Sequence, residues 1–129
     1  MGRVVHFEIH ADNPERAVEF YTRHFGWQLQ KWEGPMEYWT IQTGGKEEPG
    51  IDGGLLRRQG PAPKEGEPVS SFVCTIQVDS IDQKVAAITA SGGLIAVPKM
   101  PIPSLGWIAY FKDTEGNIVG LFQADASAG

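Results

Sequence analysis

Three side chains that could take part in chemistry stand at alternating positions near the N-terminus: His6, Glu8 and His10. Alternate residues of a β-strand share one face and lie roughly 7 Å apart, so the three could bracket one ion or one substrate. Glu8 could also raise the basicity of His6, which would make His6 a general base near neutral pH. The same spacing fits a hydrogen-bonded His6, a Glu8 paired with an arginine and a His10 at a strand end. Both interpretations remain open from the residues alone.

The strand that would carry these residues spans about 3–11, and its apolar residues fall on the opposite face. We expect that face, together with its counterpart near residue 74, to pack against a helix. This apolar set comprises Phe7, Ile9, Phe72, Cys74 and Ile76. The pattern therefore predicts that Cys74 is a buried, unreactive thiol.

The chain also resembles itself. Segment 6–27 matches segment 73–94 at a shift of 67 residues, and segment 50–56 matches segment 116–122 at a shift of 66. The matches occur in the same order along both copies, which indicates an internal duplication. The matched pairs include Ile9 and Ile76, Asp12 and Asp79, Val18 and Val85, Gly26 and Gly93, Gly54 and Gly120, and Leu56 and Phe122.

Each half has the pattern of a strand, a helix and three further strands. In the first half we expect a strand at 3–11, a helix from Asn13 to Gly26, and strands at 27–33, 37–43 and 51–58. In the second we expect a strand at 71–79, a helix from Ser80 to about residue 91, and strands near 94–97, 105–112 and 117–123. The prolines at 98, 101 and 103 predict an irregular stretch that rims whatever the sheet encloses.

This pattern predicts an α+β protein of two tandem βαβββ repeats. The first module would span residues 1–58, a linker rich in proline and glycine 59–68, and the second module 69–129. Each module leaves an open sheet edge, so two modules should pair, either within one chain or between chains.

Composition excludes several classes of protein. The 129 residues carry a net charge of −5, which disfavours binding to nucleic acid or to an anionic membrane. No apolar run approaches the ~18 residues of a membrane span, and the N-terminus lacks a signal-peptide pattern. The single cysteine excludes an internal disulfide and fits the cytoplasm, and the three histidines leave few imidazoles for a metal.

Five segments carry a resemblance to a known family: VHFEI at 5–9, DNPERAVEFY at 12–21, FGW at 25–27, PKMPIPSLGW at 98–107 and DTEGNIVGL at 113–121. The chain resembles the glyoxalase, bleomycin-resistance and extradiol-dioxygenase superfamily, also called vicinal oxygen chelate. Within it the chain is similar to the branch of predicted enzymes related to lactoylglutathione lyase. The resemblance implies a cup-shaped mixed sheet with helices outside and a small-molecule cavity inside.

The resemblance also implies four positions for the ligands of a divalent metal, on the first and last strands of each half. They correspond to His6, Gly54, Val73 and Gly120, of which His6 alone carries a metal-binding side chain. A metal held by His6 alone would bind weakly, because open catalytic sites typically use about three protein ligands. Whether the protein uses a metal cofactor stays open.

Two functions follow from this interpretation. The first is an enzyme of the lyase or isomerase type, with His6 and Glu8 as catalytic residues. The alternative is a non-catalytic protein that sequesters an apolar or aromatic compound. For either, we expect a small-molecule ligand, a homodimer and space for the ligand above Gly54 and Gly120. The candidate substrate-binding residues are His10, Trp39, Leu56, Trp107 and Phe122.

Overall fold

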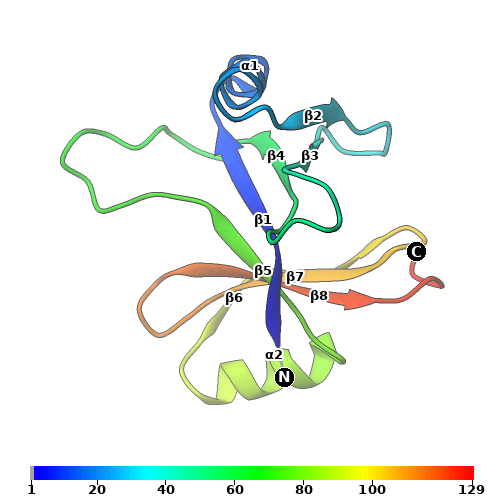
Figure 1. Cartoon of the computed structure of the whole chain (residues 1–129). Helices are drawn as coiled ribbons and strands as arrows, with labels where there is room; N and C mark the ends of the chain where they lie inside the picture. Colours follow the sequence, from blue (N-terminus) through cyan, green and yellow to red (C-terminus); the bar gives the residue numbers. More distant parts are fainter. Residues whose placement is uncertain (1) are drawn as a thin grey trace. The chain divides into compact units, whose positions relative to one another are not determined.

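The computed structural model describes residues 2–129, which fold into eight strands and two helices (Figure 1). The first half contains β1 (Arg3–Ala11), α1 (Pro14–Phe25), β2 (Gln28–Lys31), β3 (Trp39–Gln42) and β4 (Gly53–Arg57). The second half contains β5 (Val73–Gln77), α2 (Ile81–Ala90), β6 (Leu94–Ile102), β7 (Gly106–Lys112) and β8 (Ile118–Ala124). The order confirms the expected α+β class and the two βαβββ repeats.

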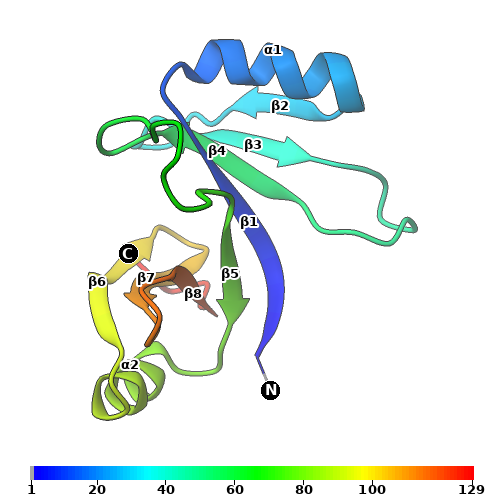
Figure 2. The same cartoon turned by 90° about the vertical axis from the view of Figure 1, so that its left-hand side faces the viewer.

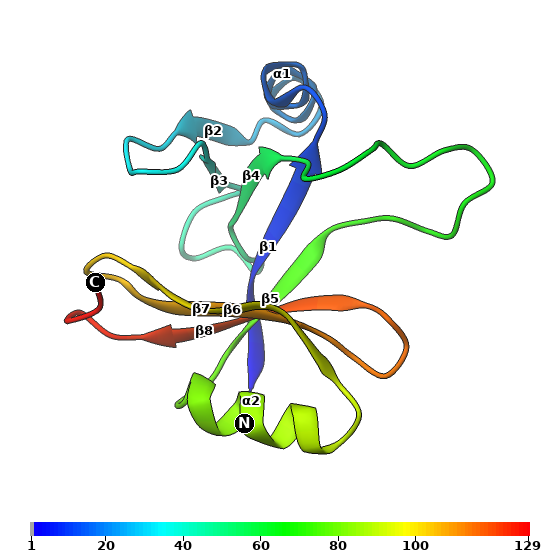
Figure 3. The ribbon, with the colours of Figure 1, turned by 180° about the vertical axis from the view of Figure 1, so that it is seen from behind.

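The described residues form two compact units, one of residues 6–72 and one of residues 2–5 with 73–129. Strand β1 therefore contributes its first residues to the second unit and the rest to the first. Residues 58–72 contain neither helix nor strand and follow an extended loop (Figure 3). The expected linker at 59–68 falls inside this loop.

The first unit is a four-stranded layer in the order β2-β3-β4-β1, with α1 running alongside it (Figure 2). Strands β2, β3 and β4 are antiparallel neighbours, whereas β1 pairs with β4 in parallel and sets Glu8 opposite Gly54. Residues Ala17, Val18 and Tyr21 of α1 pack on the buried core. This core comprises Phe7, Ile9, Ala11, Trp39, Ile41 and Leu55.

Local sequence determines both ends of α1. The Asn13 side chain accepts a hydrogen bond from the Arg16 backbone N–H at 3.1 Å, and Pro14 occupies the first helical position, where no N–H is needed. Gly26 ends the helix with a φ of 69°, and its N–H bonds the Thr22 carbonyl at 3.0 Å. The helix expected between Asn13 and Gly26 is confirmed.

The second unit orders its strands β5-β8-β7-β6, with β5 and β8 parallel and the other neighbours antiparallel. Its buried centre comprises Ile81, Ala109 and Leu121. Ser80 caps α2 by accepting a hydrogen bond from the Gln83 backbone N–H at 3.2 Å. Gln123 of β8 adds a second cap, since its side-chain oxygen accepts a hydrogen bond from the Ile81 N–H at 2.9 Å.

We expected an irregular stretch at three prolines, and this prediction is wrong for Pro98 and Pro101. Strand β6 continues from Leu94 to Ile102 through Pro98 and Pro101. It is an edge strand with two register shifts against β7, between Ile95 and Met100. A proline is tolerated at an edge or a bulge because its missing N–H leaves no ladder bond unmade.

The expected burial of Cys74 is also wrong, because the thiol is exposed. Phe72 precedes β5 and stays 42% exposed, with its ring stacked on Phe7 at 5.4 Å. The apolar cluster around α2 includes Ile76 and Val78 but does not reach Cys74. In β5 the flanking Val73 and Thr75 are buried, so Cys74 points to the opposite face of the strand, which the α2 cluster leaves uncovered at this position.

The Thr75 hydroxyl is buried in the second unit and has no hydrogen-bond partner among the described residues. An unsatisfied buried hydroxyl costs free energy, so we expect Thr75→Val to raise the free energy of unfolding by about 1 kcal/mol in urea denaturation. Thr40→Val is the matched control, because that exposed hydroxyl donates to the Gln30 carbonyl and should give no gain. A less stable Thr75→Val variant would show that the hydroxyl has a partner, such as a buried water.

Candidate functional site

The His6 imidazole and the Tyr38 hydroxyl form the central contact of the candidate site. Nε2 of His6 lies 2.9 Å from the Tyr38 hydroxyl oxygen, although the two residues are 32 positions apart. Strand β1 carries His6 on the face opposite Phe7 and Ile9, and Tyr38 ends the loop that leads into β3. Both residues belong to the first unit.

Glu8 lies two residues beyond His6 on the same strand and is 4% exposed. Burial raises the pKa of the Tyr38 phenol far above its usual range, and the charge of Glu8 and its hydrogen bond to the phenol raise this pKa further. The phenol is therefore neutral at physiological pH and keeps a proton that it can donate. Tyr38 therefore joins His6 and Glu8, the two residues expected to share one face of the strand.

Gly54 makes room for this arrangement. A Cβ at position 54 would lie 1.7 Å from the Tyr38 hydroxyl oxygen and 2.0 Å from Cζ, far inside any real contact. Only glycine therefore allows Tyr38 to reach His6. We expected the missing side chain of Gly54 to leave space for a ligand, and the structure corrects this, because the Tyr38 phenol fills that space.

Two opposing effects determine the protonation of His6. Burial lowers the pKa of the imidazole and is the largest influence, while the nearby carboxylates of Glu8 and Asp52 raise it by less. Glu8 acts in the expected direction, yet the net pKa is below the usual value of about 6.5. His6 is therefore a neutral imidazole at pH 7, able to accept a proton.

The residues of this site do not fit a divalent metal. Gly54 offers no donor, Tyr38 occupies the space beside Nε2 of His6, and the two remaining family positions hold Val73 and Gly120. Within residues 2–129 there is no group of three or more His, Cys, Asp or Glu side chains that could hold a metal ion. Two donors on β1 fall short of the about three protein ligands of an open metal site.

The other candidate residues of the first unit lie in different surroundings. His10 is half-buried opposite Leu56 in the β1–β4 register, and its carbonyl accepts a bond from Arg58 at 3.0 Å. Trp39 is 6% exposed and packs in the core beside Ile41. Of these residues, His6 and Glu8 contact Tyr38, whereas Trp39 packs in the core.

Trp107 and Phe122 belong to the second unit. The Trp107 indole N–H donates to Asp125 at 3.0 Å, and the ammonium of Lys99 lies 4.6 Å from the Trp107 ring centroid. The Phe122 ring packs over Gly106, where a Cβ would lie 2.8 Å from the ring. Both aromatic rings therefore have packing partners within their own unit.

The second unit repeats the glycine arrangement with different chemistry. Thr75 stands opposite Gly120 in the β5–β8 register, as Glu8 stands opposite Gly54. A Cβ at Gly120 would lie 3.0 Å from the Thr75 hydroxyl oxygen and 3.1 Å from the Tyr110 ring. The duplication thus keeps the glycine, and a hydroxyl replaces the carboxylate, while Tyr110 pairs with Gly120 as Thr40 pairs with Gly54.

The Tyr38 hydroxyl is a candidate site group that the sequence analysis did not identify. No spacing rule links position 38 to position 6.

A hollow of about 320 Å³ lies beside the start of α1 and is lined by residues including Asp12 and Asn13, but His6 is not among them. The signal that could have found Tyr38 is Gly54, because a glycine opposite a buried carboxylate requires something to fill its space.

Two βαβββ units that each set a polar side chain opposite a glycine define a duplicated α+β protein. Residues 3–121 match the model of the Glyoxalase/Bleomycin resistance protein/Dioxygenase superfamily, and the chain belongs to this superfamily. A Glyoxylase-like domain-containing protein of Didymella fabae is 30% identical over 118 residues, covering 90% of this chain and 89% of that one.

Solved structures share the fold. A hypothetical protein of Bacillus halodurans C-125 has a TM-score of 0.67 at 14% identity, covering 99% of this chain and 98% of that one. A methylmalonyl-CoA epimerase of Streptomyces coelicolor, in complex with 2-nitronate-propionyl-CoA, has a TM-score of 0.66 at 17% identity, covering 98% and 97%. Identities this low establish a common fold and no common activity. Within the described chain, no helix has both the length and the apolar character needed to span a membrane.

Proposed function

We propose that the protein is a small-molecule enzyme of the isomerase or lyase type that moves a proton next to a carbonyl group without a metal. The observation that carries this proposal is the 2.9 Å hydrogen bond between a neutral His6 and a neutral Tyr38. A neutral imidazole is a base, and a neutral phenol is a hydrogen-bond donor. Reactions that pass through an enolate need both groups.

The proposed reaction inserts the substrate between these two groups. The unprotonated ring nitrogen of His6 takes the proton from the carbon beside the carbonyl, and the electron pair of that C–H bond forms the enolate. The Tyr38 hydroxyl donates a hydrogen bond to the enolate oxygen. His6 then returns the proton, and its delivery to the opposite face of that carbon, after the enolate has turned, gives the isomer. His6 and Tyr38 each exchange a protein partner for a substrate atom, and Tyr38 gives up its hydrogen bond to Glu8 when it donates to the enolate oxygen.

Exchange of hydrogen for deuterium tests the proposal. We expect the protein to incorporate deuterium from D₂O beside the carbonyl of methylmalonyl-CoA or S-lactoylglutathione, detected by NMR. His6→Gln and Tyr38→Phe should each lower the rate by 10²- to 10⁴-fold, the usual contribution of a positioned acid or base. His24→Gln is the control, because His24 is exposed on α1.

Two further readouts separate this mechanism from its competitors. The exchange rate should survive EDTA, and on the acid side it should fall only below about pH 6.5, because burial lowers the pKa of His6. Protonation of His6 removes the base, so the loss follows falling pH. Loss of exchange in EDTA, with recovery on adding a divalent metal, would contradict the metal-free mechanism.

A binding protein that sequesters an apolar or aromatic compound is the second candidate. The family model supports it, because it includes bleomycin-resistance proteins. A thermal shift with an aromatic compound, together with no exchange in either probe, would favour this alternative. In both cases we propose a homodimer in the cytoplasm, with His10, Leu56, Trp107 and Phe122 as candidate contacts for the small molecule.

A further inference from the structure

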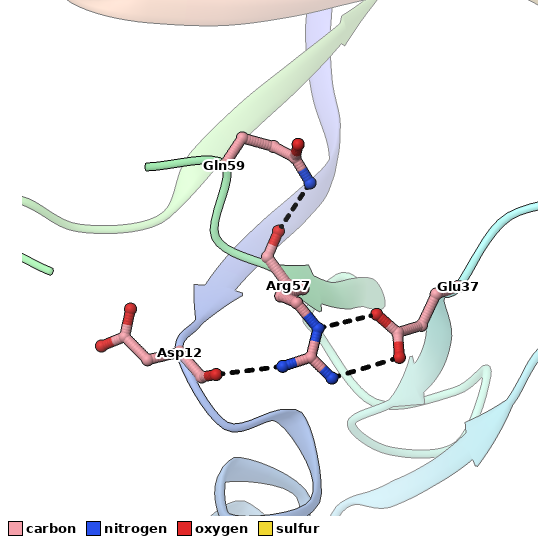
Figure 4. A network of polar contacts seen from close by, with 4 residues as sticks. All are labelled: Asp12, Glu37, Arg57 and Gln59. Atoms are coloured by element: carbon pink, nitrogen blue, oxygen red, sulfur yellow. Dashed lines mark hydrogen bonds and ion pairs between the residues drawn. The ribbon is translucent and has the colours of Figure 1, made fainter. Parts of the chain in front are cut away.

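An ion pair joins the loop before β3 to the end of β4 (Figure 4). Arg57 donates from Nε to Oε1 of Glu37 at 3.0 Å and from Nη2 to Oε2 at 3.3 Å, which makes the pair bidentate. The remaining nitrogen, Nη1, donates to the Asp12 carbonyl at 3.2 Å. One guanidinium thus links the end of β4, the junction of β1 with α1, and the residue before Tyr38.

Glu37 is the immediate neighbour of Tyr38, and their side chains have different partners. Glu37 reaches the exposed Arg57, whereas Tyr38 reaches the half-buried His6. Beyond Glu37, a backbone bond of 2.7 Å from the Trp32 N–H to the Tyr38 carbonyl closes the loop. The Trp32 ring meets the Tyr38 ring edge-on, with centroids 6.2 Å apart.

Strand β4 therefore acts on Tyr38 at two points. Gly54 leaves the space that the phenol occupies, and Arg57, three residues later, holds the backbone from which the phenol extends. A bidentate guanidinium–carboxylate pair fixes direction as well as distance, which a single ammonium contact does not. The pair is therefore suited to orienting its neighbour.

We propose that Arg57 is a positioning residue that, through Glu37, holds the Tyr38 hydroxyl against His6. The meaning of this contact for catalysis rests on the proposed function, but the contact itself can be measured without a substrate. Arg57 and Glu37 are 48% and 41% exposed, so removing the pair should leave the fold intact. The hydrogen bond with Arg57 also holds the pKa of Glu37 below its usual range, which keeps the carboxylate charged at neutral pH.

NMR titration of the His6 imidazole tests this proposal. In Arg57→Gln and Glu37→Gln, Tyr38 should leave His6 for part of the time, and the pKa of His6 should rise toward its usual value as the imidazole meets water. An exposed ion pair supports a change of about two- to fivefold in the population of the Tyr38–His6 contact. We expect kcat for deuterium exchange to fall by the same factor, with little change in KM.

Three controls make the result decisive. Arg23→Gln removes an exposed arginine of α1 and should leave the titration of His6 unchanged. The exchanged pair Glu37→Arg with Arg57→Glu should restore most of the native titration. In a Tyr38→Phe background, Arg57→Gln should have no further effect, because the hydroxyl on which it acts is gone.

The proposal is overturned if Arg57→Gln leaves the His6 titration unchanged, or if it shifts the titration equally with and without the Tyr38 hydroxyl. It is also overturned if Arg57→Gln acts and Glu37→Gln does not, since Arg57 would then work through Asp12. If the protein shows no exchange activity but the pKa of His6 still shifts as predicted in the variants, the proposed function is contradicted and this inference is supported.

Discussion

Replacing Gly54 with alanine should destabilise the first unit by about 3 kcal/mol and remove the Tyr38 phenol from His6. The new methyl group would lie 1.7 Å from the phenol oxygen and 2.5 Å from Cε1, so the ring must leave rather than shift slightly. Its departure opens the His6 imidazole to water and takes one hydrogen bond from the buried Glu8. Urea denaturation measures the stability, and NMR titration of His6 measures the loss of the contact.

A double-mutant cycle separates the clash from any other effect of the new methyl group. Tyr38→Ala removes the ring, so in that background Gly54→Ala should cost much less than it does alone. Gly60→Ala is the matched control, because a Cβ there meets nothing within 4 Å and the change should stay within about 0.5 kcal/mol. Equal costs of Gly54→Ala with and without Tyr38 would contradict the assigned role of the glycine.

Leu55→Ala should lower the free energy of unfolding by about 2–5 kcal/mol. Leu55 follows Gly54 on β4, is 0% exposed and packs in the core that α1 covers. The effect combines the lost apolar burial with a cavity that the neighbouring strands can only partly close. Thermal or chemical denaturation checks it.

Leu94→Ala is the control for this change, because Leu94 is exposed at the start of β6 and should shift stability by less than about 0.5 kcal/mol. Comparison with Leu121→Ala, in the core of the second unit, extends the test. If Leu55→Ala cost no more than Leu94→Ala, α1 would not be packed over β4 as described.

The Gly54 and Leu55 predictions concern neighbouring residues that serve opposite faces of one strand. On one face β4 supports the core of the first unit, and on the other it leaves the space in which Tyr38 meets His6. Because β1 pairs with β4 in parallel, Glu8 falls opposite that space. A single strand pairing therefore couples stability to the candidate chemistry.

The amino-acid sequence by itself determined the features that depend on neighbours in the chain. Asn13 and Gly26 mark the ends of α1 because caps are made by side chains and backbone groups within a few residues. The alternation along 3–11 places His6 and Glu8 on one face because the strand period is two. The duplication and the superfamily are likewise readable without coordinates.

The tertiary structure alone decided which distant groups meet. Tyr38 reaches His6 across 32 residues only because β1, β3 and β4 assemble in one register, and no local pattern encodes that register. The exposure of Cys74 likewise depends on which residues of β5 the α2 cluster covers, and Cys74 is not among them. Local propensity fixes the ends of the helices, whereas a site made of hydrogen bonds between separate strands exists only once those strands have packed.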